Sequence, residues 1–170
     1  MVSITFIFLL IFYHFIIMLQ RIQTVYLLIV VALMITTLFL PLAVLTAGDV
    51  VYAFDATGVN TMIGQPELIY PTWGLFALTA VISLIALATI FLFKKRILQI
   101  RLCVFNALLM LGFYGLFAFF VWTFKGQMPE AVLGLKFGLA LPFVCLVLDY
   151  LAIRNIGADE ALVRSLDRLR

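Results

Sequence analysis

One carboxylate lies within an apolar stretch of this sequence and has the clearest potential for chemistry. Asp149 occurs in the run "LPFVCLVLDYLAI", five residues before Arg154. A helical rise of about 1.5 Å per residue places it roughly 7 Å inside that charged boundary. Asn106 follows Arg101 by the same interval, so we expect the two side chains at matching depths on neighbouring helices. Because an ionisable group in a membrane span is costly, this carboxylate either has a functional role or is paired.

Two interpretations of Asp149 follow from its surroundings. In the first, it is the proton or substrate site of a small transporter or channel. In the second, it belongs to a polar clasp buried between helices. A transport acid would have a polar path continuing outward, but the residues that precede it, "FGLALPFVCLVL", are apolar. We therefore favour the clasp, whose candidate members are Asp149, Asn106, Gln23, Arg21 and Arg101.

The other reactive residue types form no recognisable catalytic or metal-binding pattern. His14 is the only histidine, which excludes a multi-histidine metal site and disfavours a catalytic triad. Cys103 and Cys145 form no Cys-x-x-Cys pair and lie at different expected depths, which favours two reduced thiols. The sequence also lacks a Gly-rich phosphate loop and a serine elbow. We predict that the protein is not an enzyme and uses neither a metal nor a cofactor.

The overall composition predicts an all-α membrane protein. Hydrophobic residues make up 66% and charged residues 11% of the chain, with a mean hydropathy of +1.27. A soluble fold would have too little polar surface. Because the apolar runs lack the alternation of barrel strands, we expect helices, which bond their backbone groups internally. Four stretches have the length of about 20 residues that crosses a bilayer. They lie at about 24–46, 74–93, 102–124 and 135–153.

The distribution of Lys and Arg predicts the orientation of these spans. Basic residues precede the first span, follow the fourth, and fill the connection "KKRILQIR" between the second and third. Only Lys125 and Lys136 of the 11 basic residues lie on the other side. Because positive loops stay cytoplasmic, both termini are expected in the cytoplasm. The basic isoelectric point of about 9.0 then reflects topology, and no nucleic-acid partner is predicted.

The outward loop, 47–73, is the largest segment expected outside the lipid. It contains the strand-forming run "VVYAF" and turn-forming glycine and proline residues, which predict a small cap with a β-hairpin. The aromatic side chains near the outer boundary are typical of the interfacial belt of membrane proteins. These belt residues are Tyr52, Tyr70, Trp73 and Trp122.

The first 17 residues carry no charge and differ from the rest of the chain. As a fifth helix they would force Arg21 into a cramped cytoplasmic turn. They also lack the basic start and the cleavage site of a signal peptide. We expect 1–17 to be an extension upstream of the true start at Met18, so that 18–153 forms the four-helix bundle.

The last segment, 154–170, is predicted to form a cytoplasmic amphipathic helix. Acidic residues open its sequence "ADEALVRSLDRLR" and basic residues close it, as the helix dipole favours. This helix either lies on the inner leaflet or docks a membrane-protein partner or a second copy. Its candidate docking residues are Leu162, Arg164, Leu166, Arg168 and Leu169.

The two ends of the chain resemble a known family. "MLQRIQTVYLLIVVALM" and "LDYLAIRNIGADEALVRSLDRLR" are similar to the opening and closing motifs of small bacterial four-helix membrane proteins, domain of unknown function 4293. The resemblance covers 18–170, and residues 1–17 depart from it. It implies four spans in a bacterial cytoplasmic (inner) membrane and no assigned activity.

Two function classes remain open from the sequence. The missing catalytic chemistry and the exposed end motifs favour a non-catalytic scaffold or accessory subunit of the membrane. Asp149 supports the alternative, a small transporter or channel. A scaffold should have a dry core, whereas a transporter needs a hydrated cavity that reaches the carboxylate.

Overall fold

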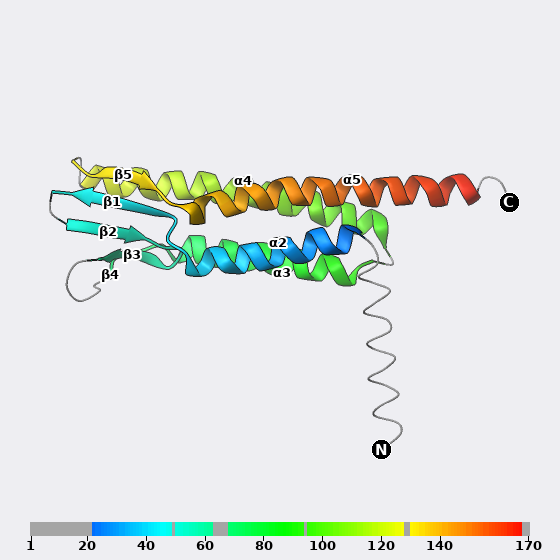
Figure 1. The fold of residues 1–170 in the computed structure, drawn as a ribbon, viewed down its shortest axis with the longest axis horizontal. Coiled ribbons are helices and arrows are strands. Elements are labelled where there is room, and N and C mark those ends of the chain that lie inside the picture. Colours follow the sequence, from blue (N-terminus) through cyan, green and yellow to red (C-terminus); the bar gives the residue numbers. More distant parts are fainter. Residues whose placement is uncertain (1–21, 49, 63–67, 94, 128–129, 168–170) are drawn as a thin grey trace, which may run out of the picture.

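The computed structural model describes residues 22–48, 50–62, 68–93, 95–127 and 130–167 (Figure 1). The expected extension 1–17, Met18 and Arg21 lie outside the described residues. The helices are α2 (Ile22–Phe39), α3 (Trp73–Phe91), α4 (Arg96–Gln127) and α5 (Leu141–Asp167), with a short 3₁₀ helix η1 (Phe137–Ala140). The strands are β1 (Ala43–Ala47), β2 (Val50–Phe54), β3 (Gly58–Thr61), β4 (Leu68–Pro71) and β5 (Val132–Leu135).

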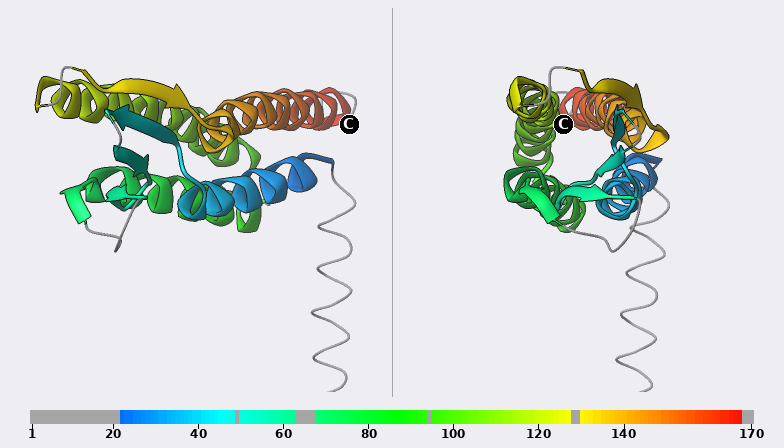
Figure 2. Two further views of the ribbon diagram at one scale, coloured as in Figure 1. Left: turned by 60° about the vertical axis from the view of Figure 1, so that its left-hand side comes forward. Right: turned by 90° about the vertical axis from the view of Figure 1, so that its left-hand side faces the viewer.

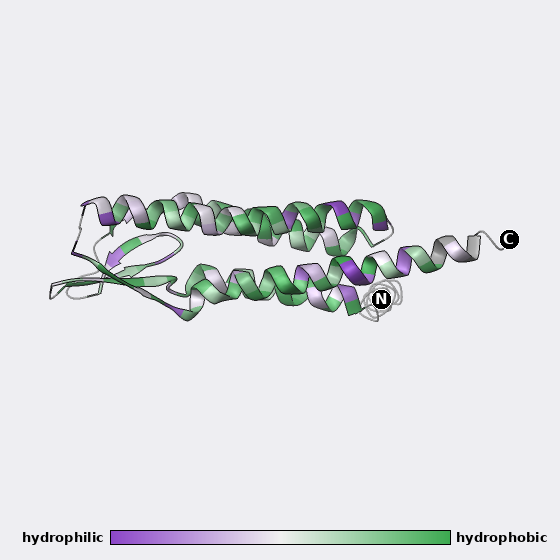
Figure 3. Ribbon diagram, turned by 90° about the horizontal axis from the view of Figure 1, so that it is seen from above, coloured by the Kyte–Doolittle hydropathy of each residue, from purple (hydrophilic) through white to green (hydrophobic). Residues whose placement is uncertain are grey.

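The described part of the chain contains four helices that are long and apolar enough to cross a membrane. Each packs against its neighbours in the cycle α2–α3–α4–α5–α2, so the bundle closes around a common interior (Figure 2). Its outward faces are also apolar, with large exposed side chains such as Leu84, Leu108 and Phe143. Hydrophobic residues make up most of the length of the helices (Figure 3). The prediction of four long apolar helices is confirmed for the described residues.

An antiparallel sheet forms one end of the molecule, with strand order β4-β3-β2-β1-β5 (Figure 1). The first four strands follow one another along the chain, whereas β5 arrives from beyond α4 and pairs with β1. The expected hairpin is therefore part of a larger structure of five strands. The opposite end of the bundle, where α5 extends beyond the other helices, is called the distal end below.

Several predicted helix boundaries are wrong, and proline explains two of them. Helix α2 ends at Phe39 rather than near 46, because Pro41 has no backbone N–H and restricts the residue before it. The chain then enters β1. Helix α5 begins only at Leu141, so Pro142 occupies its first turn, where proline is tolerated. Neither proline therefore lies in the middle of a helix.

The basic connection and the tail also differ from the prediction. Helix α4 begins at Arg96, so most of "KKRILQIR" is helical, and its 32 residues span about 48 Å. Helix α5 continues without a break to Asp167. The expected separate tail helix is therefore the end of the fourth helix, because no helix-breaking residue interrupts "IRNIGADEALVRSLD" strongly enough.

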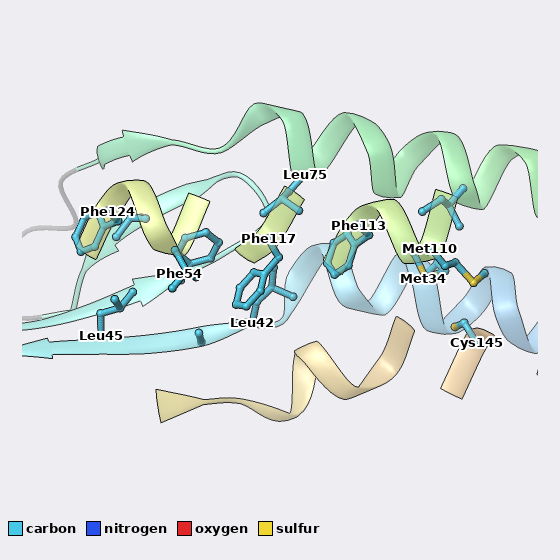
Figure 4. Packing of buried hydrophobic residues seen from close by; sticks show 14 of the residues in the cluster. Met34, Leu42, Leu45, Phe54, Leu75, Met110, Phe113, Phe117, Phe124 and Cys145 are labelled. Carbon is cyan, nitrogen blue, oxygen red and sulfur yellow. The ribbon is translucent and has the colours of Figure 1, made fainter. Parts of the chain in front are cut away.

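The half of α4 nearer the sheet packs beneath the strands and contributes to the larger apolar core (Figure 4). The rings of Phe54 and Phe117 meet edge to face at a centroid distance of 5.2 Å, and those of Tyr52 and Phe124 at 5.8 Å. Tyr52 is thus a core residue rather than an interfacial anchor, while Trp122 is 82% exposed.

The junction between sheet and bundle depends on a close backbone contact at η1. A Cβ atom on Gly138 would lie 2.5 Å from the Pro41 carbonyl oxygen, so only glycine fits there without movement. The Tyr114 hydroxyl donates a hydrogen bond to the Leu139 carbonyl oxygen at 2.9 Å. This bond links α4 to η1. These contacts fix where α5 starts relative to α2.

Candidate functional site

Four polar side chains are buried inside the bundle near its distal end. Asp149 is 0% exposed, and the three amides are 1–2% exposed. The carboxylate belongs to α5, and the amides belong to α2 and α4. We call this set the distal polar group, and it consists of Gln23, Gln99, Asn106 and Asp149.

Helix geometry explains how these side chains come to face one interior. Gln99, Cys103 and Asn106 are spaced by four and three residues and therefore share one face of α4. Cys103 belongs to a small apolar layer to which all four helices contribute. The buried members of this layer are Leu27, Ile90, Cys103, Ala152 and Ile156.

The distal polar group lies on both sides of this apolar layer. Gln23 precedes Leu27 by one turn on α2, which places it toward the distal end, level with Gln99. Asp149 lies three residues before Ala152 on the antiparallel α5, on the side toward the large core. The Cys103 thiol faces the Asp149 carboxyl.

None of the eight amide and carboxyl atoms in the distal polar group has a hydrogen-bond partner in the described part of the chain. The Cys103 thiol does not meet the geometry of a hydrogen bond to Asp149, and the Cys145 thiol points to the Val30 carbonyl at 3.8 Å. Burial without hydrogen bonds costs several kcal/mol for such groups. The distal polar group is therefore the costliest feature of the interior.

Buried hydroxyl groups in the same bundle behave differently. Thr79 Oγ1 donates to the Leu75 carbonyl at 2.7 Å, and Thr89 Oγ1 donates to the Ile85 carbonyl at 2.7 Å. Ser83 Oγ donates to Thr79 in the same way. Polar groups elsewhere in the helices are thus satisfied locally, which makes the distal group distinctive.

The predicted clasp residues are brought together only in part. The structure buries Asp149, Asn106 and Gln23 in one interior but forms no direct hydrogen bond among them. The Arg101 side chain lies on the exposed side of α4, because it is two residues from both Gln99 and Cys103. Arg21 lies outside the described residues. Gln99 joins the site although the sequence analysis assigned it to the basic connection.

Beyond Asp149, toward the sheet, the described interior contains no buried amide or carboxyl group, and the buried hydroxyls of the helices bond to carbonyl oxygens of their own helix. Cys145 is one turn away on α5, and the large core continues through Met110 and Phe113 to the sheet (Figure 4). Among the described residues, no group of three or more His, Cys, Asp or Glu side chains could hold a metal ion.

A second candidate site is an open groove between the outer end of α4 and β5. Its volume is about 530 Å³. Its lining is apolar except for one ammonium group, and consists of Phe117, Ala118, Val121, Trp122, Lys125, Gly126 and Leu133.

One wall of this groove is the edge strand β5. The Lys136 N–H donates to the Leu42 carbonyl, and these residues lie opposite each other in the β1–β5 register. Because bonded pairs alternate in an antiparallel ladder, Gly134 and Val132 also turn their backbone groups toward β1. The N–H and C=O groups of Leu133 and Leu135 therefore point away from the sheet, toward the free edge.

The free edge of β5 is also apolar. The side chains of Val132 and Leu135 are 69% and 64% exposed. The sequence did not predict this strand, because "VLGL" continues into the fourth apolar stretch. A short apolar run of this kind does not distinguish a strand from a helix. The downstream proline at 142 was the one available sign of a later helix start.

The predicted docking residues of the tail can be located only in part. Leu162 is exposed on α5. The side chains of Arg164 and Leu166, and the whole of Arg168 and Leu169, lie outside the description. The Arg96 guanidinium donates a hydrogen bond of 2.9 Å to the Asp159 carbonyl oxygen, which fastens the start of α4 to the extended part of α5.

A family model described as Domain of unknown function (DUF4293) matches residues 19–169. The chain belongs to this family. The match covers every described element of the DUF4293 chain, from α2 to α5, and the family description assigns no activity. A search of curated proteins finds no match.

Proposed function

We propose that this DUF4293 protein is a non-catalytic, multi-pass protein of the bacterial cytoplasmic membrane that serves as a scaffold or accessory subunit. Four apolar helices with apolar outward faces support placement in a bilayer. The bias of Lys and Arg toward one side supports cytoplasmic termini and an outward sheet. The observation that carries the accessory role is the free apolar edge of β5.

An unpaired strand edge is unfavourable in either environment. In lipid, the free N–H and C=O groups of Leu133 and Leu135 have no water to bond with. In water, an apolar edge is prone to pair with another strand. An added strand would satisfy the backbone groups and cover Val132, Leu135 and Trp122 at the same time.

The groove defines the chemistry of the expected partner. We expect an extended segment of another membrane or periplasm-facing protein, with apolar side chains at alternate positions facing the groove. Lys125 lines the groove, so an acidic residue at that end of the segment would be favoured. A second copy in the same orientation is disfavoured, because the strands run along the long axis of the bundle (Figure 1). Antiparallel pairing of β5 with itself would turn the partner upside down.

Photocrosslinking in native membranes tests this proposal. A photoreactive residue at Val132 should give a discrete crosslinked product, whereas one at the exposed bundle residue Leu108 should give only lipid adducts. Leu135→Pro removes an N–H that points to the free edge and should abolish the product. Gly134→Pro is the contrasting variant, because it removes an N–H bonded to β1 and should destabilise the sheet.

Two results would contradict the accessory role. One is the same crosslinking pattern at Val132 and Leu108. The other is a product that persists unchanged in a folded Leu135→Pro variant. A product with the mass of a dimer would identify a second copy as the occupant instead of a different protein.

The transporter alternative requires a polar path through the bundle. Between Asp149 and the sheet the described interior is mostly apolar, and its few buried hydroxyls are bonded to their own helix backbone, which supports the scaffold instead. A proton-flux assay in proteoliposomes tests the alternative, which predicts a flux that Asp149→Asn abolishes.

A further inference from the structure

We infer that Asp149 is a proton-binding site inside the bundle, which exchanges its proton with the distal side while the sheet side stays sealed. This inference uses the membrane placement proposed above but not the β5 partner. It assigns a ligand, the proton, to the distal polar group.

The first step is that none of the described residues places a compensating charge beside Asp149. The sequences of α2 and α3 contain no charged residue. On α4 and α5 the nearest basic residues, Arg101 and Arg154, both lie on exposed faces. The remaining titratable groups that face the carboxyl are the thiols of Cys103 and Cys145. Protonation of Asp149 is the change that removes the desolvation cost of a bare carboxylate here.

The second step is the lack of donors that would hold the anion. A buried carboxylate that is kept ionised normally accepts two or three hydrogen bonds. Both oxygens of Asp149 lack a partner in the described residues, although three amides are buried in the same interior. In a clasp the amide donors would face the carboxylate. Without such donors, the neutral acid is the less costly form of this buried side chain.

The third step is the asymmetry of the surroundings. Toward the distal end, one apolar layer that contains the small residues Cys103 and Ala152 separates Asp149 from the level of Gln23 and Gln99. Gln99 precedes Asn106, which lies at the depth of Asp149, by seven residues, so this separation is about two helical turns, or roughly 10 Å. Toward the sheet, the apolar core continues without a buried amide or carboxyl among the described residues. Proton exchange is therefore easier from the distal side, which the basic residues place in the cytoplasm.

Carbodiimide labelling tests the site on the full chain in proteoliposomes. Dicyclohexylcarbodiimide is apolar and adds to a protonated carboxyl, and the product rearranges to a stable N-acylurea that mass spectrometry locates. We expect modification of Asp149 that decreases as the pH is raised, and none at that position in Asp149→Asn. Asp159, on the distal extension of the same helix, is the internal control and should stay unmodified.

Infrared spectroscopy supplies a readout that does not depend on access of the reagent. The C=O stretching band of a protonated carboxylic acid should be present at neutral pH, absent in Asp149→Asn, and reversibly lost at alkaline pH. Absence of that band in a folded wild-type protein would overturn the inference, whatever the labelling shows. Protection from labelling by Na⁺ at constant pH would also overturn it, because the site would then bind a metal cation.

Discussion

The sheet end and the distal end of the bundle treat buried polar groups in opposite ways. At the sheet end, the buried Thr72 hydroxyl lies 3.0 and 3.1 Å from the carbonyl oxygens of Asp55 and Ala56, and Asn60 Nδ2 donates to Asp55 at 3.2 Å. At the distal end, Asp149 and three amides are equally buried and make no hydrogen bond in the described residues. The hydrogen bonds at the sheet end stabilise the fold. The buried polar side chains at the distal end make no such bonds in the described part of the chain and destabilise the fold, so stability alone does not explain why they are present.

The largest expected effect concerns the aromatic core of the sheet end. Phe54→Ala removes a fully buried ring that packs on Phe117, and should lower the free energy of unfolding by about 3–5 kcal/mol. Thermal unfolding in mild detergent measures this loss. Phe119→Ala is the matched control, because that ring is 62% exposed, and its effect should be much smaller. Equal losses in the two variants would show that the sheet does not depend on α4.

The second-largest loss of stability is expected at the junction between the sheet and the helix bundle. Gly138→Ala would place a methyl group against the Pro41 carbonyl and should destabilise the protein by about 1–3 kcal/mol. Gly115→Ala adds the same methyl group to α4, where no atom lies within 4 Å. That control should be neutral or stabilising by up to about 1 kcal/mol, because alanine favours a helix. A tolerated Gly138→Ala would contradict the close contact at η1.

A hydrogen-bond deletion at the sheet end gives a smaller effect. Thr72→Val keeps the shape of the side chain but removes the donor to Asp55 and Ala56, and should cost about 1–2 kcal/mol. Thr36→Val, at an exposed position of α2, should stay within about 0.5 kcal/mol of wild type. Chemical or thermal unfolding of both variants under the same conditions measures the difference in their free energies of unfolding. No difference between them would remove the contrast between the two ends.

The helices could be predicted from the sequence, because unbroken apolar runs have few other solutions in a chain of this composition. The sheet could be predicted only in part. β1 ("AVLTA") and β5 ("VLGL") continue the apolar runs of the first and fourth helices, so hydropathy alone does not separate them. Their pairing also joins residues nearly 90 positions apart, as in Val44 with Gly134, which no local pattern encodes.

The candidate site, like the fold, could be predicted from the sequence only in part. The depth match between Asp149 and Asn106 follows from helical rise and agrees with their shared burial. Gln99 was missed because the basic residues around it suggested a loop, although its spacing from Cys103 and Asn106 matches one helix face. Hydrogen bonds among these groups depend on side-chain directions set by packing, which the sequence does not specify.

The most direct test of the contrast between the two ends is the stability of Asp149→Leu in a lipid or detergent environment. Because the carboxyl has no hydrogen-bond partner among the described residues, an apolar side chain of similar size should leave the thermal midpoint unchanged or raise it. Asp149→Asn, which keeps a polar group, should lie close to wild type. A fall for Asp149→Leu as large as that expected for Phe54→Ala would show that Asp149 holds the bundle together, and would contradict a proton site retained for function.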